Sequence, residues 1–185
     1  EKAVTVLGVN ILKNIALSFV IAKELSYPDG QIFDFNYFWR RSITFAVAAE
    51  LLAKEMNTPS ADTFVSALLS DIGVLILHQA IPTTYQKVLN EKKLTKESVL
   101  AIETRFLGMN HAEMGSGVLE RWNLPDTIHL PIRYHHEPDL APKQHRQTAK
   151  ILQIADRLAA IYMDQNSGIR ARRLQTELID CFNFT

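Results

Sequence analysis

Five side chains in this 185-residue sequence have the chemistry of metal ligands or proton-transfer groups: Asp71, His111, His135, His136 and Asp156. Each one lies at the end of an expected helix or on an otherwise apolar one. Imidazole and carboxylate groups bind catalytic divalent ions and leave coordination positions open for water. A single aspartate or histidine in such a place is usually a hydrogen-bonded core or surface residue. Together, the five predict a shared site more strongly than any one of them does.

Asp71 raises the sharpest question, because it stands almost at the centre of the apolar stretch "SALLSDIGVLILH" at residues 66–78. A charge in such a helix needs a partner or a ligand, since an unpaired buried carboxylate is costly. The partner has to come from another part of the chain.

The elements that must position these residues are helices. Apolar residues recur at three and four positions, and no alternating run is long enough for a sheet, so the pattern predicts an all-α bundle of about nine helices. Thr95 and Asn110 are expected N-caps, and Gly115 and Gly117 are expected to permit close helix packing. The expected helices cover residues 7–25, 36–56, 61–79, 82–93, 95–106, 110–122, 125–136, 143–163 and about 169–180.

Composition narrows the function classes. Twenty basic residues balance twenty acidic ones, so no net field draws in nucleic acid or an anionic membrane, and the basic run at 170–173 is read as a solvated face. The apolar windows 15–22 and 64–81 are read as buried helices, because the first is too short for a membrane span and Asp71 interrupts the second. One cysteine, Cys181, excludes an internal disulfide, and no signal peptide is found. These features predict a cytoplasmic protein.

Several ordered motifs resemble the HDOD branch of the HD phosphohydrolase superfamily. They are "FWRRSITFAVAAELLA" at 38–53, "FVSALLSDIGVLIL" at 64–77, "HAEMGSGVLERWNLP" at 111–125 and "IRYHHEP" at 132–138. The resemblance implies one domain over residues 1–185, with 1–35 as the tail of an N-terminal HDOD portion and 36–185 as an HD-like helical core. It also implies that the earliest helices of the family domain are missing from this chain.

The same resemblance implies a metal site, and two positions depart from it. Catalytic HD enzymes use a histidine, a His-Asp pair and a later aspartate, and relatives with two metals add three histidines. Arg41 stands at the first histidine and Ser70 at the histidine of the pair, while Asp71, His111, His135, His136 and Asp156 match the remaining positions.

These two departures weigh against a catalytic ion. A permanently charged guanidinium repels an ion, and a hydroxyl is a poor neutral ligand. We therefore expect Arg41 to pair with Asp71 or Asp156, and we expect no cofactor. The three histidines remain a less favoured trio for a divalent metal.

Three functions follow from this reading. The resemblance favours a non-catalytic bacterial regulatory module that binds other signalling proteins, such as receiver, diguanylate cyclase or phosphodiesterase modules. The alternative is a divergent metal-dependent phosphohydrolase acting on nucleotides or cyclic dinucleotides. A third reading is a pseudo-enzyme that uses Arg41 and the histidines to bind a nucleotide. The sequence leaves homo-oligomerisation open.

Overall fold

The computed structural model describes residues 34–163, and every regular element in this range is a helix. The predicted all-α class is confirmed. The predicted helices over residues 7–25 and after Gly168, the basic run at 170–173 and Cys181 lie outside the described residues. The described elements are α2 (Phe35–Glu55), α3 (Ser60–Leu69), α4 (Ile72–Ala80), α5 (Pro82–Leu94), α6 (Val99–Leu107), α7 (His111–Arg121), α8 (Asp126–Arg133), the 3-10 helix η1 (Pro138–Leu140) and α9 (Lys143–Met163).

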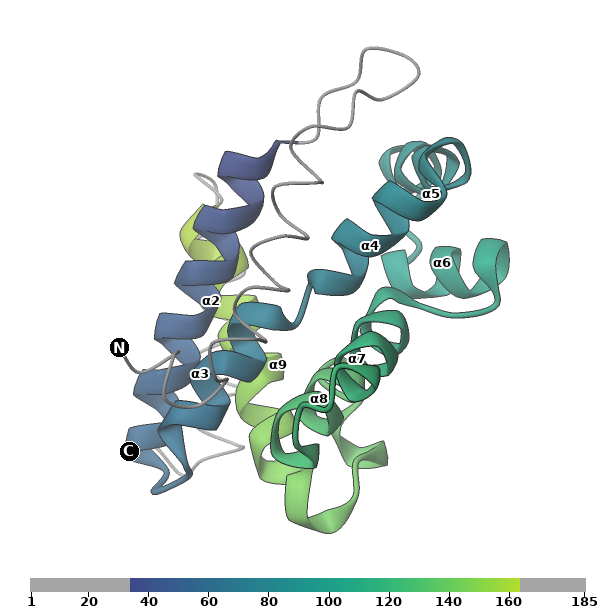
Figure 1. The fold of residues 1–185 in the computed structure, drawn as a ribbon. Helices are drawn as coiled ribbons and strands as arrows, with labels where there is room; N and C mark the ends of the chain where they lie inside the picture. Colours follow the sequence, from purple (N-terminus) through teal and green to yellow (C-terminus); the bar gives the residue numbers. More distant parts are fainter. Residues whose placement is uncertain (1–33, 164–185) are drawn as a thin grey trace.

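The two long helices, α2 and α9, lie side by side, and α3 packs against both of them (Figure 1). Their contact is built from residues with the predicted helical spacing: Phe45 and Ala49 of α2 are fully buried with Ile151 of α9. Burying a phenylalanine or isoleucine side chain contributes about 1.5–3 kcal/mol. The pairing fixes the relative positions of Arg41 and Asp156, which the same two helices carry.

The helices α4, α7 and α8 form a second packed group. The helices α7 and α8 pack against each other, α4 packs against α7, and α8 contacts α3 and α9. Farther out, α4 leads to α5 and α6 (Figure 1). Buried residues of α5 and α6, including Tyr85, Val88 and Ile102, form a smaller core there together with Leu77 of α4.

The predicted helix over residues 61–79 is wrong in one respect, because the chain breaks between Leu69 and Ile72. Ser70 and Asp71 form a turn between α3 and α4, with Asp71 at φ −94° and ψ 9°. Neither glycine nor proline marks this break in the sequence. The break gives eight α-helices in the described range instead of the seven predicted there, and it places Asp71 at the N-terminus of α4 rather than within a helix.

A close crossing of α4 and α7 sets the distance between Asp71 and His111. Gly73 lies so near the start of α7 that a Cβ on it would overlap the backbone carbonyl of His111. A Cβ on Gly115 would lie 3.2 Å from the Gly73 nitrogen. The predicted packing role is confirmed for Gly115, whereas Gly117 has no atom within 4 Å of its Cβ position. Two glycines therefore bring the two backbones into contact beside the site.

The helix termini confirm one expected cap and correct another. Asn110 and Glu113 form the predicted capping box, each side chain accepting from the other's backbone N–H at 3.0 Å. Thr95 does not cap α6, because its hydroxyl donates to Glu91 of the preceding helix. Ser98 takes that role and accepts from Ala101 N–H at 3.2 Å. Propensity alone does not separate a threonine from a serine three residues later.

The apolar stretch over residues 61–80 has the length and hydropathy of a membrane span, and 67% of it is buried inside the protein. It is interrupted by the turn at Asp71. The stretch serves as core, as predicted for residues 64–81.

Candidate functional site

Five separate elements deliver the predicted site residues to one place. Arg41 comes from α2, Asp71 from the N-terminus of α4, and Asp156 from α9. His111 is the first residue of α7, where the α4 crossing holds it. His135 and His136 lie in the turn that follows α8, which ends at Arg133 rather than at 136 as predicted. Because they are outside a regular helix, the two adjacent histidines are able to face the same centre.

Arg41 bridges the two aspartates. Its Nη1 donates to Oδ2 of Asp71 and its Nη2 donates to Oδ1 of Asp156. All three side chains are mostly buried, with exposed fractions of 23%, 12% and 19%. The expected pairing is confirmed, and it involves both carboxylates rather than one. A fork of guanidinium donors suits such bidentate bridging.

The two carboxylates that share the Arg41 cation have pKa values shifted in opposite directions. Asp71 strongly raises the pKa of the Arg41 guanidinium, so the cation is permanent. Burial raises the pKa of Asp71, but Arg41 and the three histidines outweigh it and bring the pKa down to about 2. For Asp156, burial and the charge of Asp71 outweigh Arg41 and raise the pKa. Asp71 is therefore the carboxylate that keeps its charge most firmly.

Ser70 does not offer a ligand to the site. Its side chain is fully buried, and the hydroxyl donates to the Ser66 carbonyl one helical turn earlier at 2.8 Å. Such back-bonding satisfies the hydroxyl within α3. The Ser70 hydroxyl is therefore engaged within α3 and does not face the Arg41–aspartate bridge as a ligand.

The three histidines form a compact cluster next to Asp71. One ring nitrogen of each, from His111, His135 and His136, lies within 4.8 Å of the other two. Nε2 of His111 is 3.0 Å from Nε2 of His136 and 3.8 Å from Oδ1 of Asp71. The rings of His135 and His136 have centroids 3.8 Å apart. Gln153 of α9 holds this segment by donating to the His136 carbonyl at 2.9 Å.

Hydrogen bonds fix the tautomer of two of these rings. Nδ1 of His111 is 2.7 Å from the Glu103 carboxylate, and Nδ1 of His135 is 2.7 Å from the Ile132 carbonyl. Carboxylates and carbonyls only accept, so both Nδ1 atoms carry hydrogen. Nε2 of His135 is buried and has no hydrogen-bond partner among the described residues.

Glu103 and Tyr85 belong to the site and were missed from the sequence. Glu103 is fully buried on α6 and accepts from the Tyr85 hydroxyl at 2.7 Å as well as from His111. The signal was available, because Glu103 lies on the same helical face as Val99 and Ile102. An acid on an apolar face is the pattern that singled out Asp71.

Burial and neighbouring charges shift the pKa values of the three imidazoles in different directions. Burial, helped by the charges of the neighbouring histidines, lowers the pKa of His135 to about 4 and that of His136 to about 2. Burial also opposes the charge of His111, but the hydrogen bond and charge of Glu103 outweigh it and raise the pKa. His135 and His136 are therefore neutral at pH 7, which is the form that binds metal.

HD enzymes bind metal ions, and the aspartate pair and the histidine cluster of this chain differ in whether they fit an ion. At the aspartate pair the residues do not fit an ion, because the Arg41 guanidinium already bonds both carboxylates. At the histidine cluster the residues do fit one, since neutral imidazoles are available and one buried nitrogen has no partner.

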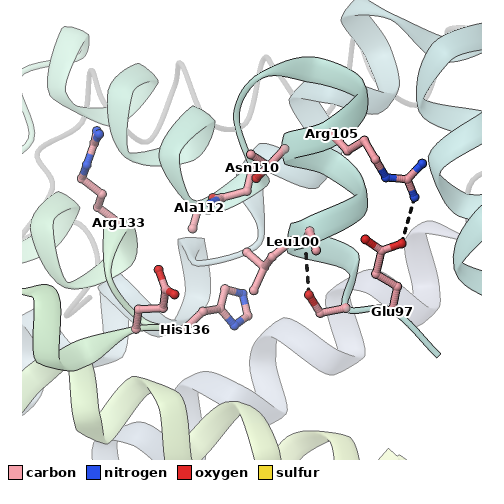
Figure 2. A pocket seen from close by; sticks show the side chains of 11 residues that line it. Glu97, Leu100, Arg105, Asn110, Ala112, Arg133 and His136 are labelled. Atoms are coloured by element: carbon pink, nitrogen blue, oxygen red, sulfur yellow. Dashed lines mark hydrogen bonds and ion pairs between the residues drawn. The ribbon is translucent and has the colours of Figure 1, made fainter.

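A cavity of about 560 Å³ opens beside the cluster. It lies between α6, the start of α7 and the turn after α8, with His136 and Arg133 on its wall (Figure 2). Arg105, also on the wall, is engaged by Glu91 and Glu97 at 2.9 and 2.8 Å. Of the residues expected to meet a nucleotide phosphate, His136 lines this cavity, while Arg41, His111 and His135 do not.

A serine–histidine–aspartate chain elsewhere does not form a nucleophilic site. Ser116 Oγ is 3.4 Å from Nδ1 of His129, whose Nε2 is 3.1 Å from Asp126. The serine is 2% exposed whereas the aspartate is largely in solvent. A buried hydroxyl cannot reach a substrate, so these hydrogen bonds link α7 to α8.

Comparisons with known proteins agree with this architecture. A protein of Shewanella amazonensis SB2B, provisionally named a phosphohydrolase, has a TM-score of 0.72 at 22% identity, covering 96% of this chain and 64% of its own. An HDOD domain protein of unknown function from Geobacter sulfurreducens has a TM-score of 0.63 at 20% identity, covering 98% of this chain and 70% of its own. A protein of Marinobacter aquaeolei VT8, provisionally named for signal transduction, has a TM-score of 0.65 at 23% identity. The match covers 94% of this chain and 41% of the Marinobacter protein. These likenesses establish the fold.

A sequence relative and a family model add to the fold comparison. An uncharacterised protein of Treponema pallidum (strain Nichols) is 25% identical over 148 residues, which is 79% of this chain and 28% of that protein. The HDOD domain model matches residues 1–138, which include every site residue except Asp156. That match covers well over half of the sequence, and the chain accordingly belongs to the HDOD domain family.

Proposed function

We propose that this HDOD domain is a non-catalytic bacterial regulatory module that acts by binding other signalling proteins. The observation that carries the proposal is the Arg41 bridge between Asp71 and Asp156. The bridge supplies internally the positive charge that a metal ion supplies to HD enzymes. An ion at this place has to displace a bonded, permanently charged guanidinium and is repelled by it.

The comparisons support the class of function. The Marinobacter aquaeolei relative carries a signal-transduction name, and the chain covers 41% of it, so that protein has further parts. Receiver, diguanylate cyclase and phosphodiesterase modules are the proposed partners. We place this activity in the bacterial cytoplasm.

The test is to restore the family pattern and measure turnover. Wild-type protein, Arg41→His/Ser70→His and the control Arg40→His are assayed with bis-p-nitrophenyl phosphate and cyclic dinucleotides under added Mn²⁺ or Ni²⁺. Arg40 is the exposed neighbour of Arg41, so its variant introduces a histidine outside the site. We expect no turnover above background from the wild-type protein or the control. Metal-dependent wild-type turnover that disappears in Asp71→Asn contradicts the proposal.

The histidine cluster favours a second candidate, a metal-dependent phosphohydrolase. His111, His135 and His136 are the residues that would hold the ion, which in such enzymes lowers the pKa of a bound water. In this chain Asp71 is held by Arg41, so it is a weaker fourth ligand than a free carboxylate. The same turnover assay separates the two candidates.

A further inference from the structure

The pair formed by Tyr85 and Glu103 is a buried polar unit that the proposed function does not use. Glu103 is fully buried and Tyr85 is 1% exposed. The carboxylate receives three hydrogen bonds: the Tyr85 hydroxyl at 2.7 Å, the His111 backbone N–H at 2.9 Å and the His111 ring at 2.7 Å. A buried carboxylate costs several kcal/mol unless it is bonded in this way. All of its bonds beyond Tyr85 are directed at one histidine.

The consequence of these bonds is a fixed ring orientation. Glu103 binds both the backbone and Nδ1 of His111, so the ring cannot flip without breaking a charge-assisted bond. Nε2 is thereby turned toward His136, 3.0 Å away, and toward Asp71, 3.8 Å away. A carboxylate behind a histidine is the usual outer partner of a metal-bound imidazole, and it also raises the basicity of the ligating nitrogen.

The other two rings complete the arrangement. His135 donates Nδ1–H to the Ile132 carbonyl and leaves a buried Nε2 without a hydrogen-bond partner among residues 34–163. Two imidazoles on one tetrahedral zinc ion are about 3.4 Å apart, given nitrogen–zinc distances of roughly 2.0–2.1 Å. The His111–His136 pair is already near that spacing, and the widest separation in the cluster, within 4.8 Å, has to close by at most about 1.4 Å.

We infer that Tyr85 and Glu103 are positioning residues: they orient His111 so that the histidine trio, already described as able to hold a metal, binds a single divalent transition-metal ion such as Zn²⁺ or Co²⁺. Neutral imidazoles select these ions over Mg²⁺ and Ca²⁺, which take oxygen ligands. The site takes one ion because Arg41 occupies the neighbouring aspartate pair. The metal ligands are those named for the second candidate function, and the inference adds the two residues that position them. An ion that ties α6, α7 and the turn after α8 together is also compatible with a domain that has no turnover.

The experiment measures metal binding instead of activity. Chelator-treated full chain is titrated with Zn²⁺ by calorimetry at pH 7.5, and Co²⁺ is added separately to record the visible absorption of nitrogen-bound cobalt. We expect one ion per chain in the wild-type protein and none in His111→Ala. Glu103→Gln, which keeps the shape of the side chain, is expected to bind Zn²⁺ 10–100-fold more weakly, and Tyr85→Phe several-fold more weakly.

The matched control is Ile102→Val, at the fully buried neighbour of Glu103 on α6. This variant lowers the melting temperature of the metal-free protein and leaves the Zn²⁺ affinity and the cobalt spectrum unchanged, which separates positioning from general stability. If Glu103→Gln fails to fold, Tyr85→Phe still tests the inference, because it removes one donor from the carboxylate. Absence of stoichiometric Zn²⁺ in the wild-type protein, or wild-type affinity in a folded Glu103→Gln or Tyr85→Phe, overturns it. None of these outcomes alters the turnover result that tests the proposed function.

Discussion

Arg41 and Asp71 lie thirty residues apart in the sequence, and the guanidinium of the first donates directly to the carboxylate of the second. The same guanidinium reaches Asp156, which follows 85 residues after Asp71. One side chain therefore joins α2, α4 and α9.

Replacing Arg41 with methionine is expected to destabilise the domain strongly. The change leaves two mostly buried carboxylates without a cation, and removing one partner of a buried pair costs about 3–5 kcal/mol. Partial exposure of the three side chains places the expected loss near the lower end, about 3 kcal/mol. Urea unfolding at pH 7 measures it. Arg40→Met, at the exposed neighbour, is the control and should change the free energy of unfolding by less than about 0.5 kcal/mol.

Acid is expected to weaken the fold through Asp71. Its pKa is about 2 in the folded protein against an ordinary 3.8, so its stabilising contribution is complete above about pH 4. The contribution, about 2 kcal/mol, is lost as the pH falls from 4 through 2. The free energy of unfolding measured between pH 7 and pH 2 should therefore drop less steeply in Asp71→Asn than in the wild-type protein.

The charge of Asp156 is expected to contribute less to stability than the charge of Asp71 does. Its folded pKa is raised, so its charged form is the destabilised one in the folded state, and protonation in the folded protein is favourable. Asp156→Asn is expected to retain more stability at pH 7 than Asp71→Asn does. Equal losses in the two variants at pH 7 contradict the division of roles between the two carboxylates.

Gly73→Ala and Gly117→Ala are expected to have opposite effects on stability. A methyl group on Gly73 overlaps the His111 carbonyl, and the α4–α7 crossing has to open to admit it. Overpacking of this kind costs about 1–3 kcal/mol or more. Gly117 lies on α7 with open space at its Cβ position, so alanine there should gain about 0.5–1 kcal/mol through helix propensity. Thermal unfolding of both variants is the measurement, and a neutral Gly73→Ala disproves the close crossing.

Gln153→Ala is expected to loosen the turn that carries His136. The amide donates to the His136 carbonyl, and losing one such hydrogen bond costs about 1 kcal/mol. Amide hydrogen exchange in residues 134–137 should become faster, whereas Gln147→Ala, at an exposed position on the same helix, leaves it unchanged. Unchanged protection in Gln153→Ala shows that the turn is held by other contacts.

Helical spacing was sufficient to predict most of the described architecture, because α2, α7 and α9 each have an apolar face and α5 begins at a proline. The α3–α4 break was missed, since Ser70 and Asp71 stand in an apolar run with no local stop signal. The break accompanies long-range contacts: the crossing at Gly73 and the pairing of Asp71 with Arg41. Contacts of that kind cannot be read from local periodicity.

The site, too, could be predicted from the sequence only in part. The cation at position 41 predicted a carboxylate partner, but the sequence could not say that it would hold two. Glu103 was overlooked because no motif pointed to it, although its place on the apolar face of α6 was visible. His135 and His136 were expected at the end of a helix, and only the position of the turn after α8 explains how adjacent rings face one centre.

The close approach of Gly73 to His111 has a mechanical consequence. Backbones in contact cannot slide past each other independently, so α4 and α7 move as one body and carry Asp71 and His111 together. Arg41 belongs to a different body, formed by α2 and α9. The two bodies meet where α8 packs on α3 and α9 and where Gln153 bonds the turn that carries His136, and the Arg41 guanidinium adds a direct link to Asp71. A displacement of α2 therefore reaches Asp71 directly through this guanidinium and reaches the histidine cluster through the neighbouring helix contacts.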